Sequence, residues 1–229
     1  GAVKRAGRLA SAMMKPLPDV DRSLELYARA GERIPGWTQL ISRRASRFAA
    51  GVSPIYAQRA KGCRFVDVDE NTYIDWVSAF GAIVLGYADG AVNKVVKDQI
   101  DRGSLYSVNS PLEIELAEEL VGAIPSAEMV RYTKGGGEAC ALAVRIARGT
   151  TGRDRILFCG YHGWHDWYQA ANYLPDPVTG TFPVAGVDPI GVPRALAGTT
   201  IPFHYGDLEM LENLLNQHQG EIAAIMMEP

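Results

Sequence analysis

Lys134-Gly135-Gly136-Gly137-Glu138-Ala139 is the stretch that decides the fold of this chain. The apolar run Met129–Thr133 before it predicts a strand, and the apolar spacing across 141–147 after it predicts a helix. Three glycines permit positive φ angles and the close approach of a ligand, and a helix start offers unpaired N–H groups to an anion. The sequence therefore predicts a phosphate cradle at 135–137; a tight connection that binds nothing is the alternative.

A second motif, Gly160-Tyr161-His162-Gly163-Trp164-His165-Asp166, follows the apolar run Arg155–Cys159. A third apolar run, Ile222–Met227, ends at Glu228-Pro229. In open α/β sheets, ligands gather at the carboxyl ends of the strands. A phosphate cradle beside an aromatic side chain and a polar ring suits a planar, phosphorylated cofactor.

In this order the motifs resemble the class III, fold type I pyridoxal-phosphate aminotransferases, and most of all their glutamate-1-semialdehyde aminomutase-like branch. The resemblance runs from about Ile34 to the end of the chain. It implies an α/β large domain with a mostly parallel sheet and helices on both faces, and pyridoxal 5′-phosphate as the cofactor. Its motifs are Ile34-Pro35-Gly36, Lys61-Gly62-Cys63, Asp67–Asp75, Leu85–Ala88, Glu113–Glu118, the glycine turn with Arg145–Arg148, Thr151-Gly152-Arg153, the Tyr161-His162-Gly163 motif and Glu228-Pro229.

The resemblance also implies roles for single residues. Gly135, Gly136 and Gly137 are expected to bind the cofactor phosphate, mainly through backbone N–H groups. Tyr161 is expected to lie against the pyridine ring, with His162 beside it. Ordinary core packing is the alternative for Tyr161, because aromatic side chains are so often buried.

Two residues of the N-terminal part are expected near the substrate. Phe80 falls where the branch often carries an aromatic side chain, again with core packing as the alternative. Trp37 stands in a region where the semialdehyde aminomutases present an arginine to the substrate carboxylate, within a motif that this chain lacks. Trp37 is expected to narrow that pocket, which argues against the semialdehyde substrate. The sequence leaves transaminase and aminomutase chemistry both open.

The glycine turn departs from the family pattern. Relatives usually carry a hydroxyl residue or an asparagine there, whereas this chain has glycine at 135 and 137. The lost side-chain hydrogen bond to the phosphate is worth about 1–3 kcal/mol. Lys134 either pairs with the phosphate or is a solvated lysine.

The residues that carry the family's chemistry are not recognised in this chain. The resemblance implies an aspartate for the pyridine nitrogen and a Schiff-base lysine, both well beyond the Glu-Pro motif, and none of the six lysines here matches. An apolar final strand also leaves an edge that proteins usually protect. We therefore expect a fragment, or a chain completed by a partner, that does not transaminate alone. An inactive scaffold or regulatory homologue and a phosphate-ligand binding module are the alternatives.

Composition excludes several other classes. With 229 residues, 47% hydrophobic and 21% charged, the chain has enough apolar material for a core. A net charge of −3 gives no electrostatic case for nucleic acid, and no apolar stretch reaches the roughly eighteen residues of a membrane span. Three scattered cysteines fit a reducing compartment, and His162 and His165, although spaced for one helix face, have no third metal ligand with them. We expect a soluble, cytoplasmic protein that holds no metal. The resemblance implies a homodimer that takes a small amino donor and acceptor.

The chain is expected to have three parts. Residues 1–20 form a flexible N-terminus, and residues 21–89 form an N-terminal segment and part of a small domain. This segment contains a helix over 21–30 and a hairpin of Arg64–Val68 and Thr72–Trp76 with a turn at 69–71. Residues 90–229 form the first part of the cofactor-binding large domain, with alternating helices and strands. Six prolines between 175 and 202 predict a long irregular loop there.

Overall fold

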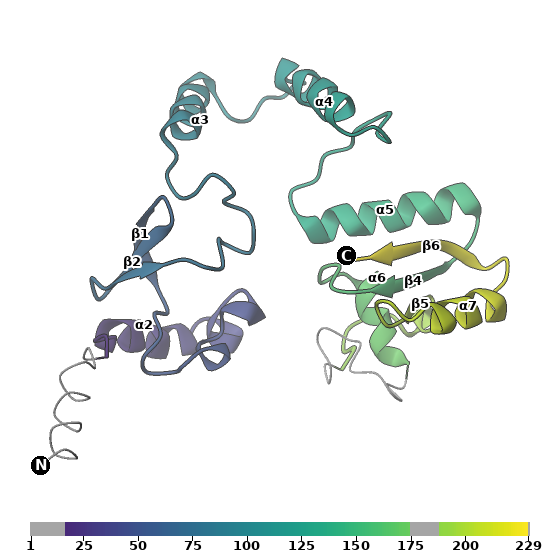
Figure 1. Cartoon of the computed structure of the whole chain (residues 1–229), viewed down its shortest axis with the longest axis horizontal. Coiled ribbons are helices and arrows are strands. Elements are labelled where there is room, and N and C mark those ends of the chain that lie inside the picture. The colour runs from purple at the N-terminus through teal and green to yellow at the C-terminus, as the bar shows by residue number, and fades with distance from the viewer. Residues whose placement is uncertain (1–16, 175–187, 229) are drawn as a thin grey trace, which may run out of the picture. The chain divides into compact units, whose positions relative to one another are not determined.

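The computed structural model describes residues 17–174 and 188–228 (Figure 1). The chain divides into two compact units, Gly1–Asn109 and Ser110–Pro229, which we name unit 1 and unit 2. The expected domain boundary at 89/90 stays a prediction, whereas the compact units of this chain divide at 109/110. The expected flexible segment at the N-terminus lies outside the described residues as far as residue 16.

Unit 1 is built around a three-stranded antiparallel sheet in the order β1-β2-β3. Its strands are β1 (Ala57–Lys61), β2 (Arg64–Asp67) and β3 (Thr72–Ile74). The other elements of unit 1 are α2 (Asp21–Gly31), the 3₁₀ turns η1 (Pro35–Trp37), η2 (Ile41–Arg43) and η3 (Ala45–Arg47), and α3 (Gly90–Arg102). The predicted helix and the predicted hairpin are both confirmed.

The turn between β2 and β3 also caps helix α2. The fully buried Asp67 accepts hydrogen bonds from the backbone N–H groups of Asp69 and Asn71, at 3.0 and 2.8 Å. The carboxylate of Asp69 in turn accepts from the N–H groups of Arg22 and Ser23, at 2.7 and 3.0 Å. Because the residue at the N-cap of α2 makes no side-chain cap, the hairpin supplies the missing acceptor.

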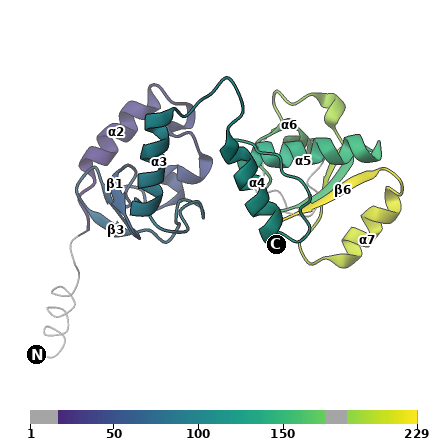
Figure 2. The same ribbon diagram turned by 90° about the horizontal axis from the view of Figure 1, so that it is seen from above.

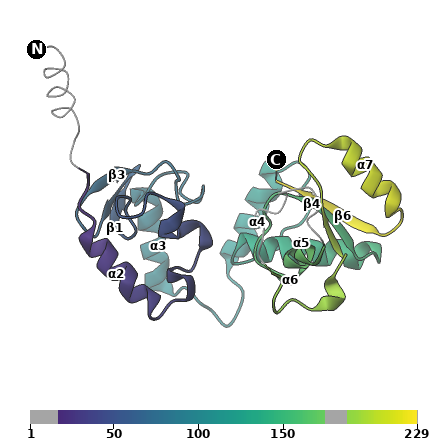
Figure 3. The same cartoon turned by 90° about the horizontal axis from the view of Figure 1, so that it is seen from below.

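Unit 2 is an α/β unit with a three-stranded parallel sheet in the order β5-β4-β6. Its elements are α4 (Pro111–Ala123), α5 (Gly136–Thr151), β4 (Arg155–Cys159), α6 (Asp166–Gln169), η4 (Ala170–Tyr173), η5 (Arg194–Leu196), β5 (Thr200–Pro202), α7 (Leu208–Gln217) and β6 (Ile222–Met227). Helices α5 and α7 lie on opposite sides of β6, as two views from opposite directions agree (Figures 2 and 3). The predicted strands at 155–159 and 222–227 and the predicted parallel sheet are confirmed.

Strand β4 carries the core of unit 2 on both of its faces. Ile156 and Phe158 pack with Val144 of α5 and with the aromatic residues of α6, whereas Leu157 on the opposite face packs against α7. All three β4 side chains are fully buried. Continuous burial of this kind is typical of a central parallel strand, in which both faces are covered and side chains alternate between them.

The prediction of a strand at Met129–Thr133 is wrong, because the backbone is irregular there. Met129 is 92% exposed, and the segment pairs with none of the described strands. Tyr132 instead donates its hydroxyl hydrogen bond to the carbonyl oxygen of Glu113 in α4, at 2.8 Å. An apolar run becomes a strand only when another strand pairs with it, and here the side chain holds the segment against a helix.

The predicted irregular loop at 175–202 falls partly outside the described residues, which omit 175–187. Its described end contains regular structure: the 3₁₀ turn η5 and then strand β5, which pairs with β4 from Thr200 to Pro202. The loop prediction is therefore wrong for residues 200–202. Pro202 is tolerated because it is the last residue of an edge strand. Its missing N–H therefore interrupts no hydrogen-bond ladder between central strands. No helix among the described residues is long and apolar enough to cross a membrane.

An ion pair joins the amino ends of the three strands of unit 2. Arg155, the first residue of β4, donates from Nε to the Glu221 carboxylate just before β6, at 2.5 Å, and from Nη1 to the carbonyl oxygen of Gly198 before β5. Glu221 also contacts His218 Nδ1 at 3.2 Å. The Arg155 guanidinium first, and His218 second, hold the pKa of the Glu221 carboxyl below its ordinary value.

This lowered pKa predicts a pH-dependent contribution to stability. Because the folded state holds the charged form, the contribution is present in full above the ordinary carboxyl pKa, and it is lost as the pH falls through the lowered value. We expect Glu221→Gln to lower the free energy of unfolding at pH 7 and to have a smaller effect at pH 2.5, measured by urea denaturation at both pH values. An equal loss at the two pH values would contradict this assignment.

Candidate functional site

The candidate site begins where β4 ends. Gly160 follows Cys159 with a φ of +87°, which turns the chain away from the sheet. A Cβ atom on Gly160 would lie 2.3 Å from Cβ of Glu228, the residue after β6. Glycine is therefore required at this position for two reasons: the backbone is left-handed, and the end of the neighbouring strand leaves no space for a Cβ atom.

The three glycines before α5 do not use the conformational freedom that the sequence suggested. Gly135 is extended, with φ −148° and ψ 161°, and Gly136 and Gly137 are the first residues of α5. None of the three has a positive φ, so that part of the prediction is wrong. What Gly137 provides is space, since a Cβ atom there would lie 3.3 Å from both Gly163 Cα and His165 Cδ2.

The start of α5 leaves two backbone donors open. The carboxylate of Glu138 reaches back to accept from the N–H groups of Lys134 and Gly135, at 3.0 and 3.1 Å. In the part of the chain that the structure describes, the N–H groups of Gly136 and Gly137 have no hydrogen-bond partner. Two free donors at the positive end of a sixteen-residue helix are suited to an anion, whereas the Gly135 N–H is already occupied. The glutamate three residues into a helix was the sequence signal for this capping, and it was missed.

Tyr161 and His162 differ sharply in exposure. The side chain of Tyr161 is 49% exposed, and its ring packs edge-on against Tyr168 with 5.7 Å between the centroids. His162 is only 6% exposed and lies within 2.8 Å of the Cys159 carbonyl oxygen through its Nε2 atom. Since a carbonyl only accepts, Nε2 carries the proton. The structure thus presents Tyr161 to solvent and holds His162 in an aromatic cluster, so the cofactor role of His162 stays a prediction.

Trp37 and Phe80 both belong to unit 1. Trp37 is about half exposed, has a φ of +62°, and stacks on Tyr27 with 6.1 Å between the ring centroids. Phe80 is also about half exposed and lies in a turn in which residues 78–80 all have positive φ. The guanidinium carbon of Arg43 lies 5.8 Å from the centroid of the Phe80 ring. Neither ring is a buried core residue, and their substrate role stays a prediction.

Glu228 is a site residue that the analysis of the sequence did not single out. Its carboxylate accepts from the backbone N–H of Tyr161 at 2.9 Å, and its own N–H donates to the carbonyl oxygen of Cys159 at 3.1 Å. The sequence signal was present, because a carboxylate directly after an apolar strand lies at the carboxyl edge of a parallel sheet. The end of β6 therefore holds the backbone that carries Tyr161.

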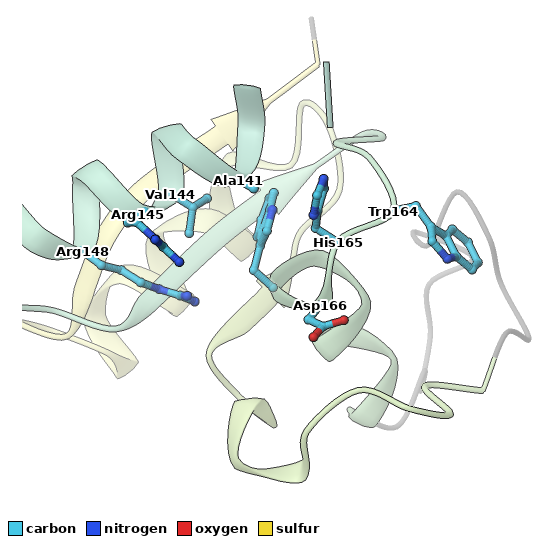
Figure 4. Close-up of a pocket in the computed structure, with 8 residues that line it drawn as sticks. Ala141, Val144, Arg145, Arg148, Trp164, His165 and Asp166 are labelled. Carbon is cyan, nitrogen blue, oxygen red and sulfur yellow. The ribbon is translucent and has the colours of Figure 1, made fainter. Parts of the chain in front are cut away.

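A cavity of about 400 Å³ lies beside this site, between α5 and the segment 164–167. Arg145 and Arg148 extend from α5, and His165 and Asp166 lie on the facing segment (Figure 4). Burial lowers the pKa of Arg148, whose Nε donates to the carbonyl oxygen of Asp154 at 2.8 Å. The residues that line the cavity are Ala141, Val144, Arg145, Arg148, Trp164, His165, Asp166 and Trp167.

The spacing of His162 and His165 suggested that they share one helix face, but the structure does not place them on a common helix. His162 is in the loop after β4, and His165 is the N-cap residue of α6. Within 17–174 and 188–228, no group of three or more His, Cys, Asp or Glu side chains is arranged to hold a metal ion. The chemistry that the described site supports is the binding of an anion beside an exposed aromatic ring.

Comparison with known proteins identifies the family. The sequence profile described as Aminotransferase class-III matches residues 47–229. The chain belongs to the class-III aminotransferase family. It is 38% identical over 213 residues to glutamate-1-semialdehyde 2,1-aminomutase from Syntrophobacter fumaroxidans, a match that covers 91% of this chain and 47% of that protein. It is 35% identical to 3-aminobutyryl-CoA aminotransferase from Cloacimonas acidaminovorans, over 91% of this chain and 46% of that protein.

Solved structures agree with this class-III assignment. An omega-transaminase from Sphaerobacter thermophilus superposes with a TM-score of 0.76 at 32% identity, covering 90% of this chain and 47% of that structure. A glutamate-1-semialdehyde aminomutase variant from Pseudomonas aeruginosa, solved with pyridoxamine phosphate, has a TM-score of 0.71 at 26% identity and is covered over 44% of its length. The chain thus has the fold of the class-III enzymes and spans about half the length of the relatives it matches.

The contact between α5 and the loop after β4 predicts a large stability effect. A Cβ atom on Gly163 would lie 2.4 Å from Gly137 Cα, and Gly163 has a φ of +100°. We expect Gly163→Ala to lower the free energy of unfolding by about 2–4 kcal/mol, the sum of overpacking and left-handed strain. Urea denaturation followed by circular dichroism measures the loss.

Gly191→Ala is the matched control for this substitution. Gly191 has a φ of +88°, but a Cβ atom there would meet nothing within 4 Å. It therefore reports backbone strain alone, which we expect to be about 1 kcal/mol. Equal losses for the two variants would show that the close contact at Gly163 contributes nothing.

Proposed function

We propose that this chain supplies the phosphate-binding and ring-binding part of a pyridoxal-phosphate-dependent aminotransferase or aminomutase that acts on a small amino compound. One observation carries the proposal. The free N–H groups of Gly136 and Gly137 begin α5 at the point where α5 contacts the loop that presents Tyr161. A phosphate donor pair and an exposed aromatic face within one contact are what a planar, phosphorylated cofactor requires.

The residues present fit the phosphate group of this cofactor. Gly136 and Gly137 would donate their backbone N–H groups, and the α5 dipole would favour the negative charge. A Cβ atom on Gly136 would meet nothing within 4 Å, so space for an approaching anion exists there. Gly135 would not donate to the phosphate in this arrangement, since Glu138 occupies its N–H. Lys134 is exposed and would add a positive charge next to the cradle.

The ring of the cofactor would lie against Tyr161, with His162 beneath it in the aromatic cluster. When bound, pyridoxal phosphate supplies an electron sink for the substrate carbanion. This chain's own contribution would be to bind the phosphate and to orient the ring through residues of unit 2. The substrate role proposed for Trp37 and Phe80 rests on the family resemblance alone. By the family resemblance, the Schiff-base lysine and the aspartate for the ring nitrogen would follow the Glu228-Pro229 motif, and none of the six lysines of this sequence matches that lysine.

The relatives indicate the substrate only as a class of compound, a small amino compound. The relatives include aminomutases, whose amino group moves within one molecule, and aminotransferases, whose amino group moves between two. The replacement of the aminomutase arginine motif around Trp37 argues against the semialdehyde substrate, but it does not decide between the two reaction types. A homodimer in the cytoplasm is part of this proposal. The family supports the homodimer, and the free thiols of Cys63, Cys140 and Cys159 support a reducing compartment.

An inactive homologue that keeps the fold is the second candidate function. The glycines at 135 and 137 and the absence of a lysine that matches the Schiff-base position favour it.

Reduction of the natural protein tests the catalytic proposal. The protein is isolated from its source, saturated with pyridoxal phosphate and reduced with borohydride, and its intact mass and peptides are mapped across Pro229. We expect one pyridoxyl-lysine, on a peptide that follows residue 229. A natural protein that carries no pyridoxyl-lysine at saturation would contradict the enzyme and support the inactive homologue.

The cradle is tested separately with Gly136→Leu. Because the position is open and its φ is not left-handed, leucine fits the fold but fills the space that the phosphate would enter. We expect the dissociation constant for pyridoxamine 5′-phosphate to rise more than about tenfold, measured by titration of this chain.

Gly149→Leu is the control for Gly136→Leu. Gly149 lies in the same helix near its other end and is equally open. We expect the control to bind pyridoxamine phosphate like the wild type, and neither variant to have a lower unfolding midpoint. Unchanged affinity in Gly136→Leu would contradict the cradle.

A further inference from the structure

Two side chains hold a single peptide group at the centre of the candidate site. The carbonyl oxygen of Gly160 accepts a hydrogen bond from the Tyr168 hydroxyl at 3.1 Å. The N–H of Tyr161, on the other side of the same peptide bond, donates to the Glu228 carboxylate at 2.9 Å. Because the C=O and N–H of a trans peptide point in opposite directions within its plane, the two hydrogen bonds hold the peptide group at opposite edges.

Tyr168 also contacts the side chain that this peptide carries. Its ring packs edge-on against the Tyr161 ring, with 5.7 Å between centroids and an interplanar angle of 80°. Tyr168 is 4% exposed, whereas Tyr161 is 49% exposed. One ring of the pair is therefore fixed in the core and the other projects from it.

The surroundings make Tyr168 a rigid support. Its ring lies in an aromatic cluster with Phe158, His162 and Trp167, at centroid distances of 5.0, 6.0 and 5.7 Å. Burial raises the pKa of the Tyr168 hydroxyl, so the hydroxyl keeps its proton and donates to Gly160. Gly160, with no side chain and a φ of +87°, has no stiffness of its own to hold the next residue.

We propose that Tyr168 is a positioning residue that sets the orientation of the Tyr161 ring for stacking on the cofactor, through the Gly160–Tyr161 peptide that it holds together with Glu228. The proposal rests on the proposed function, which puts the pyridine ring against Tyr161. Tyr168 itself does not touch the cofactor in this arrangement. Its hydroxyl fixes the peptide plane, its ring packs against the Tyr161 ring, and about half of Tyr161 stays exposed.

The test compares Tyr168→Phe with Tyr173→Phe. Tyr168→Phe keeps the ring and removes only the hydrogen bond to Gly160. Tyr173 is a matched control, because its hydroxyl also donates to backbone carbonyl groups, those of Pro189 and Val192, away from this peptide. Each variant is made in the full chain, and its unfolding midpoint is measured first.

Two readouts separate positioning from stability. The first is hydrogen exchange at the Tyr161 amide without cofactor, followed by nuclear magnetic resonance. The second is the affinity for pyridoxamine 5′-phosphate and the circular dichroism band of the bound cofactor, which depends on the angle between the two rings. For Tyr168→Phe we expect about fivefold faster Tyr161 exchange, about fivefold weaker binding and an altered dichroism band. Tyr173→Phe should leave all three unchanged.

Glu228 provides the conservative comparison. Glu228→Gln keeps an oxygen that accepts from the Tyr161 N–H, and Glu228→Ala removes it. We expect the glutamine variant to restore most of the exchange protection that the alanine variant loses.

The outcomes distinguish this inference from the function on which it rests. Wild-type chain that does not bind pyridoxamine phosphate would contradict the proposed function, and the inference with it. Wild-type binding together with unchanged exchange and dichroism in Tyr168→Phe would overturn the inference alone. Faster exchange with an unchanged dichroism band would also overturn it, because the hydroxyl would then stabilise the loop without orienting the ring.

Discussion

Unit 2 depends on one constraint, the burial of β4 on both faces and its pairing on both edges. Ile156, Leu157 and Phe158 have no exposed surface, and the strand is bonded to β5 on one side and β6 on the other. A strand held in this way has no freedom to shift its register, since a slip of one residue would exchange the side chains of its two faces. The residue at its carboxyl end is therefore delivered to a defined place.

The geometry of the candidate site depends on where β4 ends. Gly160 turns the chain out of the sheet, Glu228 at the end of β6 holds the next N–H, and Gly163 brings the loop against Gly137 at the start of α5. Each of these contacts needs either a glycine or a carboxylate at the carboxyl edge of the sheet. The start of α5 and the loop that carries Tyr161 are thus in contact, because three separate segments meet where β4 ends. The family assignment is consistent with this arrangement, because it too indicates a cofactor that needs a phosphate site and a flat ring site together.

Local patterns predicted well where local chemistry decides the structure. The hairpin of β2 and β3 follows from its turn residues, whose backbone N–H groups are bonded by Asp67, and the two buried strands follow from continuous apolar runs. The motifs also brought Tyr161 and the glycine turn to one edge of the sheet. The predictions failed where a distant partner decides. Met129–Thr133 is apolar enough for a strand but has no strand beside it, and Thr200–Pro202 is rich in loop signals but pairs with β4.

The sequence by itself determined the fold class, the family and the short list of residues at the site, because periodicity and motif order are properties of the chain alone. The tertiary structure decided what each of those residues does. It assigned the glycines before α5 the role of space and free donors rather than of unusual backbone angles, since the approach of Gly163 is a contact between distant segments. It placed His162 in the core and brought Tyr168 and Glu228 to opposite sides of one peptide bond. No local pattern encodes such contacts, because they exist only once β4 and β6 are paired.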